Sequence, residues 1–106
     1  MALKRIMRRK AANDIRNIAI YTEMTWGREQ RKKYTHGLRV CVDDIVAKPA
    51  LGISRDEIHP GLRSILYGEH ITFFLPTPEG VAIIRVLHQT MNVSRWLAPA
   101  DFVDAE

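Results

Sequence analysis

Three apolar runs dominate the second half of the chain, and two turn signals separate them. The runs cover residues 61–67, 69–75 and 81–88. Gly68 and Glu69 form the Gly-X pair that suits a two-residue type II′ hairpin, and residues 76–80 combine prolines with a glycine in a longer turn. The pattern predicts a three-stranded antiparallel meander. Residues 91–97 are long enough for one or two helical turns after it.

Helical spacing marks the first half of the chain. Between residues 10 and 26 the pattern predicts an amphipathic helix that ends at Gly27. Its predicted inward face consists of Ala12, Ile15, Ile18, Ala19, Thr22 and Trp26. A second helix is predicted over residues 28–47, where Pro49 stops it. The short link between the two helices predicts an antiparallel helical hairpin.

These elements predict an α+β fold, in which the helical hairpin packs on one face of a three- to four-stranded antiparallel sheet. Residues 2–8 are predicted to be an N-terminal strand of that sheet, and residues 49–60 a loop. A length of 106 residues fits one domain, which we place over residues 1–97. Residues 98–106 form a short acidic tail that we expect to be frayed.

Charge is divided unevenly along the chain. Residues 1–36 carry ten Lys or Arg and three Asp or Glu, a net charge of +7, whereas residues 37–106 carry six and nine, a net charge of −3. A basic segment of this size favours an acidic partner, either nucleic acid or an acidic protein segment. The alternative is a solvated helix face with no partner.

Several classes of protein are not expected. No apolar run approaches the roughly 20 residues of a membrane helix. No apolar segment follows the basic start of the chain, so we do not expect a secretory signal peptide. The single cysteine, Cys41, excludes an internal disulfide and fits a reducing cytoplasm. The four histidines are scattered, so neither a metal site nor a cofactor is expected.

Polar residues interrupt the apolar runs. They are Arg63, His70, Arg85 and His88, with Arg95 and Trp96 just after the last run. One interpretation is RNA cleavage, in which the arginines hold a phosphate and a histidine moves protons. The other is structural: the arginines pair with acidic neighbours and His88 makes hydrogen bonds at a strand end. Trp96 is either an interface anchor or a cover for the edge of the core.

A set of motifs along the chain points to a known family. The motif residues are Asp14, Ile18, Tyr21, Trp26, Gly27 and Tyr34, with residues 49–52, 55–57, 60–63, 68–71 and 84–91. The most specific is IRVLHQTM at residues 84–91. With these motifs the chain resembles, over nearly its whole length, the ParE branch of the ParE/RelE toxin superfamily. That family comprises the toxins of bacterial type II toxin–antitoxin (plasmid stabilisation) modules, and its order of elements agrees with the predicted one.

The resemblance implies a small cytoplasmic toxin that inhibits DNA gyrase and blocks replication. It implies a cognate antitoxin as partner, whose C-terminal segment wraps the toxin and neutralises it. The antitoxin's N-terminal part is expected to bind operator DNA, so the toxin contacts that DNA only indirectly. ParE-like members generally lack nuclease residues, so the chain is not expected to be an enzyme. A ribosome-dependent mRNA endonuclease of the RelE kind is the alternative function.

The resemblance also suggests which residues meet partners. Arg63, Arg85 and His88 match family motif positions, and no catalytic residue is expected. The residues expected to bind antitoxin or gyrase are Arg63, Arg85, His88, Arg95 and Trp96. The basic helix residues expected to dock the acidic residues of the antitoxin are Arg16, Arg28, Arg31 and Lys32. The antitoxin's apolar residues are expected to enter a groove beside the sheet.

Overall fold

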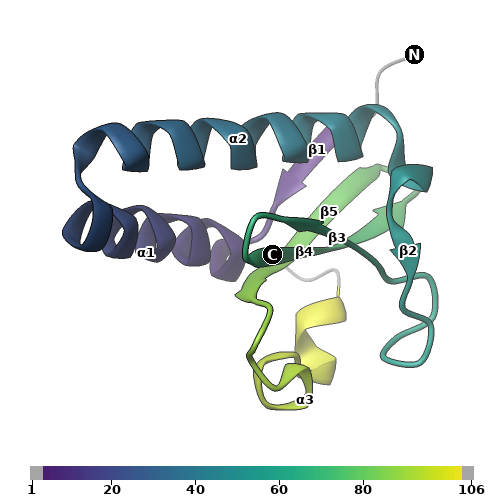
Figure 1. The fold of residues 1–106 in the computed structure, drawn as a ribbon. Helices are drawn as coiled ribbons and strands as arrows, with labels where there is room; N and C mark the ends of the chain where they lie inside the picture. The colour runs from purple at the N-terminus through teal and green to yellow at the C-terminus, as the bar shows by residue number, and fades with distance from the viewer. Residues whose placement is uncertain (1–3, 104–106) are drawn as a thin grey trace.

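The computed structural model describes residues 4–103, and its centre is a five-stranded sheet with two long helices along one face (Figure 1). In chain order the elements are β1 (Lys4–Met7), α1 (Arg9–Trp26), α2 (Arg28–Ala47), the 3₁₀ helix η1 (Pro49–Leu51), β2 (Ile53–Ser54), β3 (Arg63–Tyr67), β4 (His70–Thr77), β5 (Gly80–His88), α3 (Val93–Trp96) and the 3₁₀ helix η2 (Pro99–Phe102). The strand order is β1-β5-β4-β3-β2. The predicted α+β fold with a helical hairpin on a meander is confirmed.

The sheet has more strands than predicted, and it is mixed. β1 runs parallel to β5, from Lys4 opposite Gly80 to Met7 opposite Ile83, while the other pairs are antiparallel. β2 comes from the segment predicted to be a loop, and its two residues pair with β3. Two residues are too few to show the alternation that marks a strand in a sequence. The prediction of three or four antiparallel strands is therefore corrected to five strands of mixed direction.

The β3–β4 turn has the predicted geometry. Tyr67 lies opposite His70, so the loop between them is two residues long. Gly68 has φ +57°, and no residue other than glycine has a positive φ among those the structure describes. A positive φ at the first loop position alone is the pattern of a type II′ turn.

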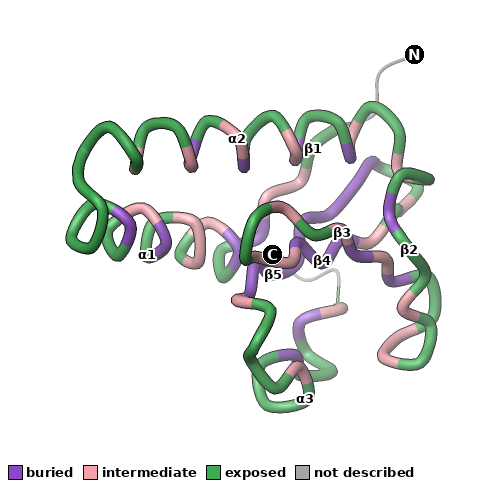
Figure 2. The backbone as a smooth tube through the Cα atoms, in the orientation of Figure 1, coloured by how far each residue is buried: buried purple, intermediate pink, exposed green. Residues whose placement is uncertain are grey.

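Both faces of the sheet are covered. The helical hairpin covers one face with a cluster made of Ala11, Val42, Ile45, Phe74, Val81 and Ile83, and continues with Ile18, Leu38 and Val86. The opposite face carries Leu62, Phe73, Ala82, Ile84, Leu87 and Leu97. Burial on both faces explains why the strands read as nearly continuous apolar runs. Figure 2 shows the buried residues along the sheet and the inner sides of the helices.

A bulge between β4 and β5 changes the alternation of side chains along β5. The pairing register shifts between Phe73 and Phe74, which leaves Ile84 as an extra residue on β5. Ile83 and Val86 consequently both pack toward the helices, although residues three apart on a regular strand face opposite ways. Arg85 lies where this change occurs.

The prediction of a frayed tail is wrong for residues 98–103. Asp101 is buried, where its carboxylate pairs with Lys10 Nζ at 2.7 Å and accepts a hydrogen bond from the Ala98 N–H at 2.8 Å. Phe102 stacks on His59 with ring centroids 4.2 Å apart. These contacts close the sheet face opposite the helices. Residues 104–106 lie outside the described residues, and a domain boundary at residue 97 stays a prediction.

The prediction that Trp26 belongs to the core is wrong. Its side chain is 69% exposed, because α1 extends beyond the part of the sheet that it covers. Ile18 and Thr22 are buried as predicted, while Ala11 rather than Ala12 is the fully buried alanine near the start of the helix. The far end of the hairpin is accordingly exposed (Figure 2).

Gly80 provides a test of the β1–β5 pairing. A Cβ atom added there would lie 2.1 Å from the carbonyl oxygen of Lys4. Gly61 is the matched control, since it also has a positive φ but an added Cβ would meet only Leu75 Cδ1 at an ordinary 3.5 Å. We expect Gly80→Ala to lower the free energy of unfolding, measured in urea, by about 1–3 kcal/mol more than Gly61→Ala does. Equal losses in the two variants would contradict the close approach.

Candidate functional site

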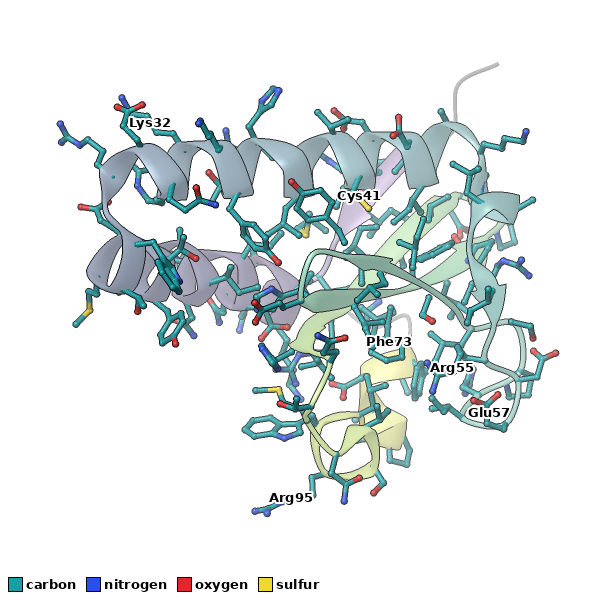
Figure 3. All side chains as sticks on the ribbon, viewed as in Figure 1. Lys32, Cys41, Arg55, Glu57, Phe73 and Arg95 are labelled. Atoms are coloured by element: carbon teal, nitrogen blue, oxygen red, sulfur yellow. The ribbon has the colours of Figure 1, made fainter. Side chains whose placement is uncertain are left out.

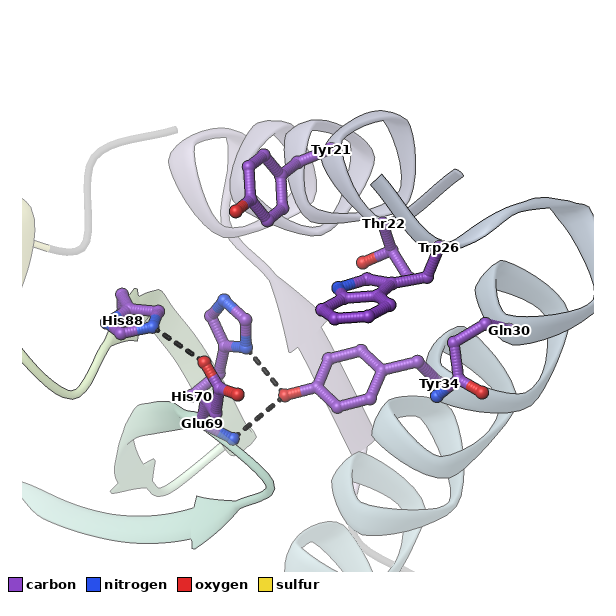
Figure 4. A pocket seen from close by; sticks show the side chains of 8 residues that line it. All are labelled: Tyr21, Thr22, Trp26, Gln30, Tyr34, Glu69, His70 and His88. Atoms are coloured by element: carbon purple, nitrogen blue, oxygen red, sulfur yellow. Dashed lines mark hydrogen bonds and ion pairs between the residues drawn. The ribbon is translucent and has the colours of Figure 1, made fainter. Parts of the chain in front are cut away.

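A pocket of about 470 Å³ opens between the far half of the helical hairpin and the β3–β4 turn (Figure 4). The residues that line it are Tyr21, Thr22, Trp26, Gln30, Tyr34, Glu69, His70 and His88. Aromatic rings from the helices and titratable groups from the sheet thus meet in one place. This combination makes the pocket the first candidate for a functional site.

Tyr34 joins α2 to the β3–β4 turn. Its hydroxyl oxygen accepts a hydrogen bond from the Glu69 N–H at 3.1 Å and lies 2.6 Å from His70 Nδ1. The same oxygen lies 3.2 Å from the carbonyl oxygen of Tyr67. A phenol has one proton, so the hydroxyl donates either to the carbonyl or to the imidazole. In both cases the wall of the pocket is fixed by side-chain hydrogen bonds.

His88 holds the Glu69 carboxylate at the mouth of the pocket. Its Nδ1 accepts a hydrogen bond from the Thr90 N–H at 3.2 Å, and its Nε2 lies 3.0 Å from Glu69 Oε1. Because Nδ1 acts as an acceptor, the proton of the neutral ring is on Nε2, which donates to the carboxylate. The rings of His88 and His70 meet edge to face at 5.3 Å.

Burial sets the charge of the pocket. It lowers the pKa of His70, and the neighbouring His88 lowers it further, while Glu69 acts in the opposite direction. Burial also raises the pKa of the Tyr34 hydroxyl. Both groups are therefore uncharged near neutral pH. Glu69 is the one acidic residue among the lining residues, and no lysine or arginine is among them.

Arg85 lies outside the pocket, in a buried ion pair with Asp14. Arg85 Nε and Nη2 donate to the two carboxylate oxygens at 2.7 and 2.8 Å, and Nη1 donates to the Trp96 carbonyl at 2.8 Å. The side chains of Arg85 and Asp14 are only 10% and 12% exposed. The hydrogen bonds to Asp14 raise the pKa of Arg85. All three guanidinium nitrogens of Arg85 bind the protein itself, and its contact with a partner stays a prediction.

Arg63 is held in a similar way. Its Nη2 donates to the carbonyl oxygens of Ala50 and Gly52, which ties η1 and the start of β2 to the sheet. Neither Arg63 nor Arg85 lines the pocket that contains His70 and His88. The structure therefore does not bring the phosphate-binding and proton-transferring residues of the RNA-cleaving interpretation into one site.

Arg95 and Trp96 lie on α3, away from the pocket. Arg95 is exposed and projects away from the domain (Figure 3). The Trp96 ring lies 5.9 Å from Arg85 Cζ, within the range of a cation–π contact, and remains 42% exposed. Trp96 thus covers Arg85 and also presents a face to solvent, and its role as an interface anchor stays a prediction.

The basic helix residues divide into two groups. Arg16 and Arg31 line a groove of about 320 Å³ on the hairpin together with the exposed side chains of Ile20 and Met24. Arg31 Nε also forms an ion pair of 2.6 Å with Glu23, which links α2 to α1. Arg28 and Lys32 are exposed near the start of α2, and Figure 3 shows Lys32 directed to solvent.

Six residues that line the pocket were not identified as site residues from sequence: Tyr21, Thr22, Trp26, Gln30, Tyr34 and Glu69. The sequence pattern places Trp26 in the core because its spacing continues the apolar face of the helix. Element length gave no signal, because the 18 residues of α1 span about 27 Å and the nine residues of β5 span about 30 Å.

Two further features are absent from residues 4–103. In that range no group of three or more His, Cys, Asp or Glu side chains is placed to hold a metal ion. No helix in the same range is long and apolar enough to cross a membrane.

Comparisons of the sequence agree on one family. A family model described as the ParE toxin of the type II toxin–antitoxin system parDE matches residues 6–93. A protein named Toxin ParE1 from Mycobacterium tuberculosis (strain CDC 1551 / Oshkosh) is 41% identical over 73 residues, which are 68% of this chain and 74% of the relative. Toxin ParE1 from Caulobacter vibrioides is 35% identical over 89 residues, which are 84% of this chain and 92% of the relative.

The fold agrees with a solved structure. A chain of the "Chromosomal ParDE TA system from P. aeruginosa" has a TM-score of 0.71 to this chain at 20% sequence identity. The match covers 82% of this chain and 96% of the solved one. At this identity the likeness concerns the arrangement of elements.

The pocket histidine gives a pH-dependent prediction. The pKa of His70 in the folded protein is lower than the ordinary value of 6.5, so the unfolded chain binds more protons just below pH 6.5. We therefore expect the free energy of unfolding to fall as the pH falls from 6.5 through the folded-state pKa. An NMR titration of His70 should give a midpoint below 6.5, and urea unfolding at a series of pH values measures the loss of stability.

His70→Asn is the control, because asparagine keeps a polar group near the position of Nδ1 but does not titrate. This variant should lack the part of the pH dependence that His70 contributes. A His70 midpoint above 6.5, or the same pH dependence in the two proteins, would contradict the assignment.

Proposed function

The chain belongs to the ParE toxin family of type II toxin–antitoxin systems, and on this premise we propose that it inhibits DNA gyrase, blocks replication and is neutralised by a cognate antitoxin. It acts in the bacterial cytoplasm by binding its target. Operator DNA is reached only through the antitoxin. The observation that carries the proposal is the exposed apolar surface of α1, because a protein of this size seldom leaves such side chains uncovered unless a partner covers them.

The groove on the hairpin suits an antitoxin segment. Ile20 is 52% and Met24 83% exposed, and Arg16 and Arg31 lie beside them. A segment that alternates apolar and acidic residues would bury the first pair and meet the charges of the second. Arg28 and Lys32 extend the positive charge toward the start of α2. The association is therefore expected to weaken as salt screens the charges.

A binding mechanism is favoured over catalysis. The histidines of the pocket have no arginine beside them among its lining residues, so the charge of a phosphorane has no cation there to stabilise it. Arg63 and Arg85, the two arginines of the endonuclease interpretation, bind backbone carbonyls and Asp14. His88, Arg95 and Trp96 remain the candidates for contact with gyrase, since each keeps an accessible surface.

Supercoiling of relaxed plasmid DNA by purified gyrase tests the target. We expect the folded protein to inhibit supercoiling or to trap cleaved DNA, and an equimolar amount of antitoxin to restore activity. Unchanged supercoiling at excess protein would reject gyrase as the target. Codon-placed cuts in mRNA of a translating extract would instead support the endonuclease alternative.

A charge placed in the hairpin groove tests the antitoxin surface. Burial of a methionine side chain stabilises an interface by about 1.5–3 kcal/mol, so Met24→Glu should weaken antitoxin binding by about 10- to 100-fold in calorimetry. Val40→Glu is the matched control: Val40 is also exposed, at 42%, but it is not among the residues that line the groove. Equal affinities for the two variants would show that the antitoxin docks elsewhere.

A further inference from the structure

We propose that the pocket between the hairpin and the β3–β4 turn binds an arginine side chain of a protein partner. The guanidinium stacks on the aromatic rings of the pocket, and its charge faces Glu69. The inference rests on the proposed function only in requiring that a protein partner supplies the side chain.

Aromatic surface is available in the pocket. Tyr21 and Trp26 are largely exposed, and Tyr34 contributes the opposite wall (Figure 4). Among the described residues Tyr34 forms ring pairs with Tyr67 and His70, whereas Trp26 forms none. A volume of about 470 Å³ is within the range of pockets that hold small ligands and exceeds what one water molecule needs. The rings therefore have faces free for a planar group.

The charge in the pocket is opposite to the charge of the chain. The whole protein carries a formal charge of +4, yet the lining contains one acidic residue and no lysine or arginine. Oxygen Oε1 of Glu69 is bound by His88, and Oε2 has no hydrogen-bond partner among residues 4–103. His70 is uncharged near neutral pH, so it does not offset the carboxylate. A cation is attracted to this lining, and an anion is repelled.

An arginine fits these groups better than a lysine or an apolar side chain. Its guanidinium is planar, so it can stack on an aromatic face and donate to a carboxylate at the same time. An apolar side chain would gain nothing from the carboxylate of Glu69, and an ammonium group would use the ring faces less fully. The polar hydroxyl of Thr22 is already occupied, since it donates to the Ile18 carbonyl at 2.7 Å.

A pair of small probes tests the site in the full chain. Nα-acetylarginine methylamide carries the proposed group, and Nα-acetylcitrulline methylamide has nearly the same shape without the charge. We expect the arginine probe to shift the NMR signals of the Trp26 indole N–H and of the Glu69 and His70 amides in a saturable way. The citrulline probe should bind about tenfold more weakly.

Two variants that each remove one negative charge test whether Glu69 causes the preference for the arginine probe. Glu69→Gln should remove the preference for the arginine probe, whereas Glu79→Gln, in the exposed β4–β5 turn, should leave it unchanged. The spectrum of each variant verifies that the fold is intact. Equal binding of the two probes, shifts outside the pocket, or a preference that survives Glu69→Gln would each overturn the inference.

The inference and the proposed function fail separately. If the antitoxin binds and gyrase is inhibited while the two probes bind equally, the arginine site is wrong and the proposed function stands. If the probes behave as expected while neither antitoxin nor gyrase binds, the arginine site stands and the proposed function is wrong.

Discussion

The ion pair of Asp14 and Arg85 is the interaction on which the rest of the structure depends. β1 pairs with β5 only as far as Ile83, so the backbone of β5 beyond that point needs another partner. Asp14 provides it by accepting the Val86 N–H at 2.9 Å, and the same carboxylate neutralises Arg85. Arg85 in turn binds the Trp96 carbonyl. A helix, strand β5 and the C-terminal segment thus meet at one buried pair of charges.

This pair also limits which charged side chains of the sheet are exposed. With Arg85 turned into the protein and Arg63 bound to carbonyl oxygens, the strands present little free charge of their own. The available surface lies at the far end of the hairpin, which extends beyond the sheet, and at the β3–β4 turn that Tyr34 holds against it. One side of this end is a groove lined by Arg16, Arg31 and Glu23, and the other is a pocket with the carboxylate of Glu69.

Features set by local sequence could be predicted, and those set by distant contacts could not. The two helices follow from their periodicity and from Gly27, and the hairpin turn follows from Gly68. The parallel pairing of β1 and the two residues of β2 have no local signal. Arg85 was recognised as unusual, but its partner lies 71 residues earlier in the chain. Trp26 was misplaced because periodicity shows which face of a helix is apolar but not where the sheet beneath it ends.

A double-mutant cycle tests most directly whether Arg85 is a scaffold residue. Asp14→Asn and Arg85→Gln remove one charge each, and the double variant removes both while it keeps the approximate shape. If the pair holds the scaffold, urea unfolding should show a loss of about 3–5 kcal/mol for each single variant, since each leaves a buried charge unpaired. The double variant should lose clearly less than the sum of the two. Small and additive losses would contradict the account, because they would mean that Arg85 is free to serve a partner.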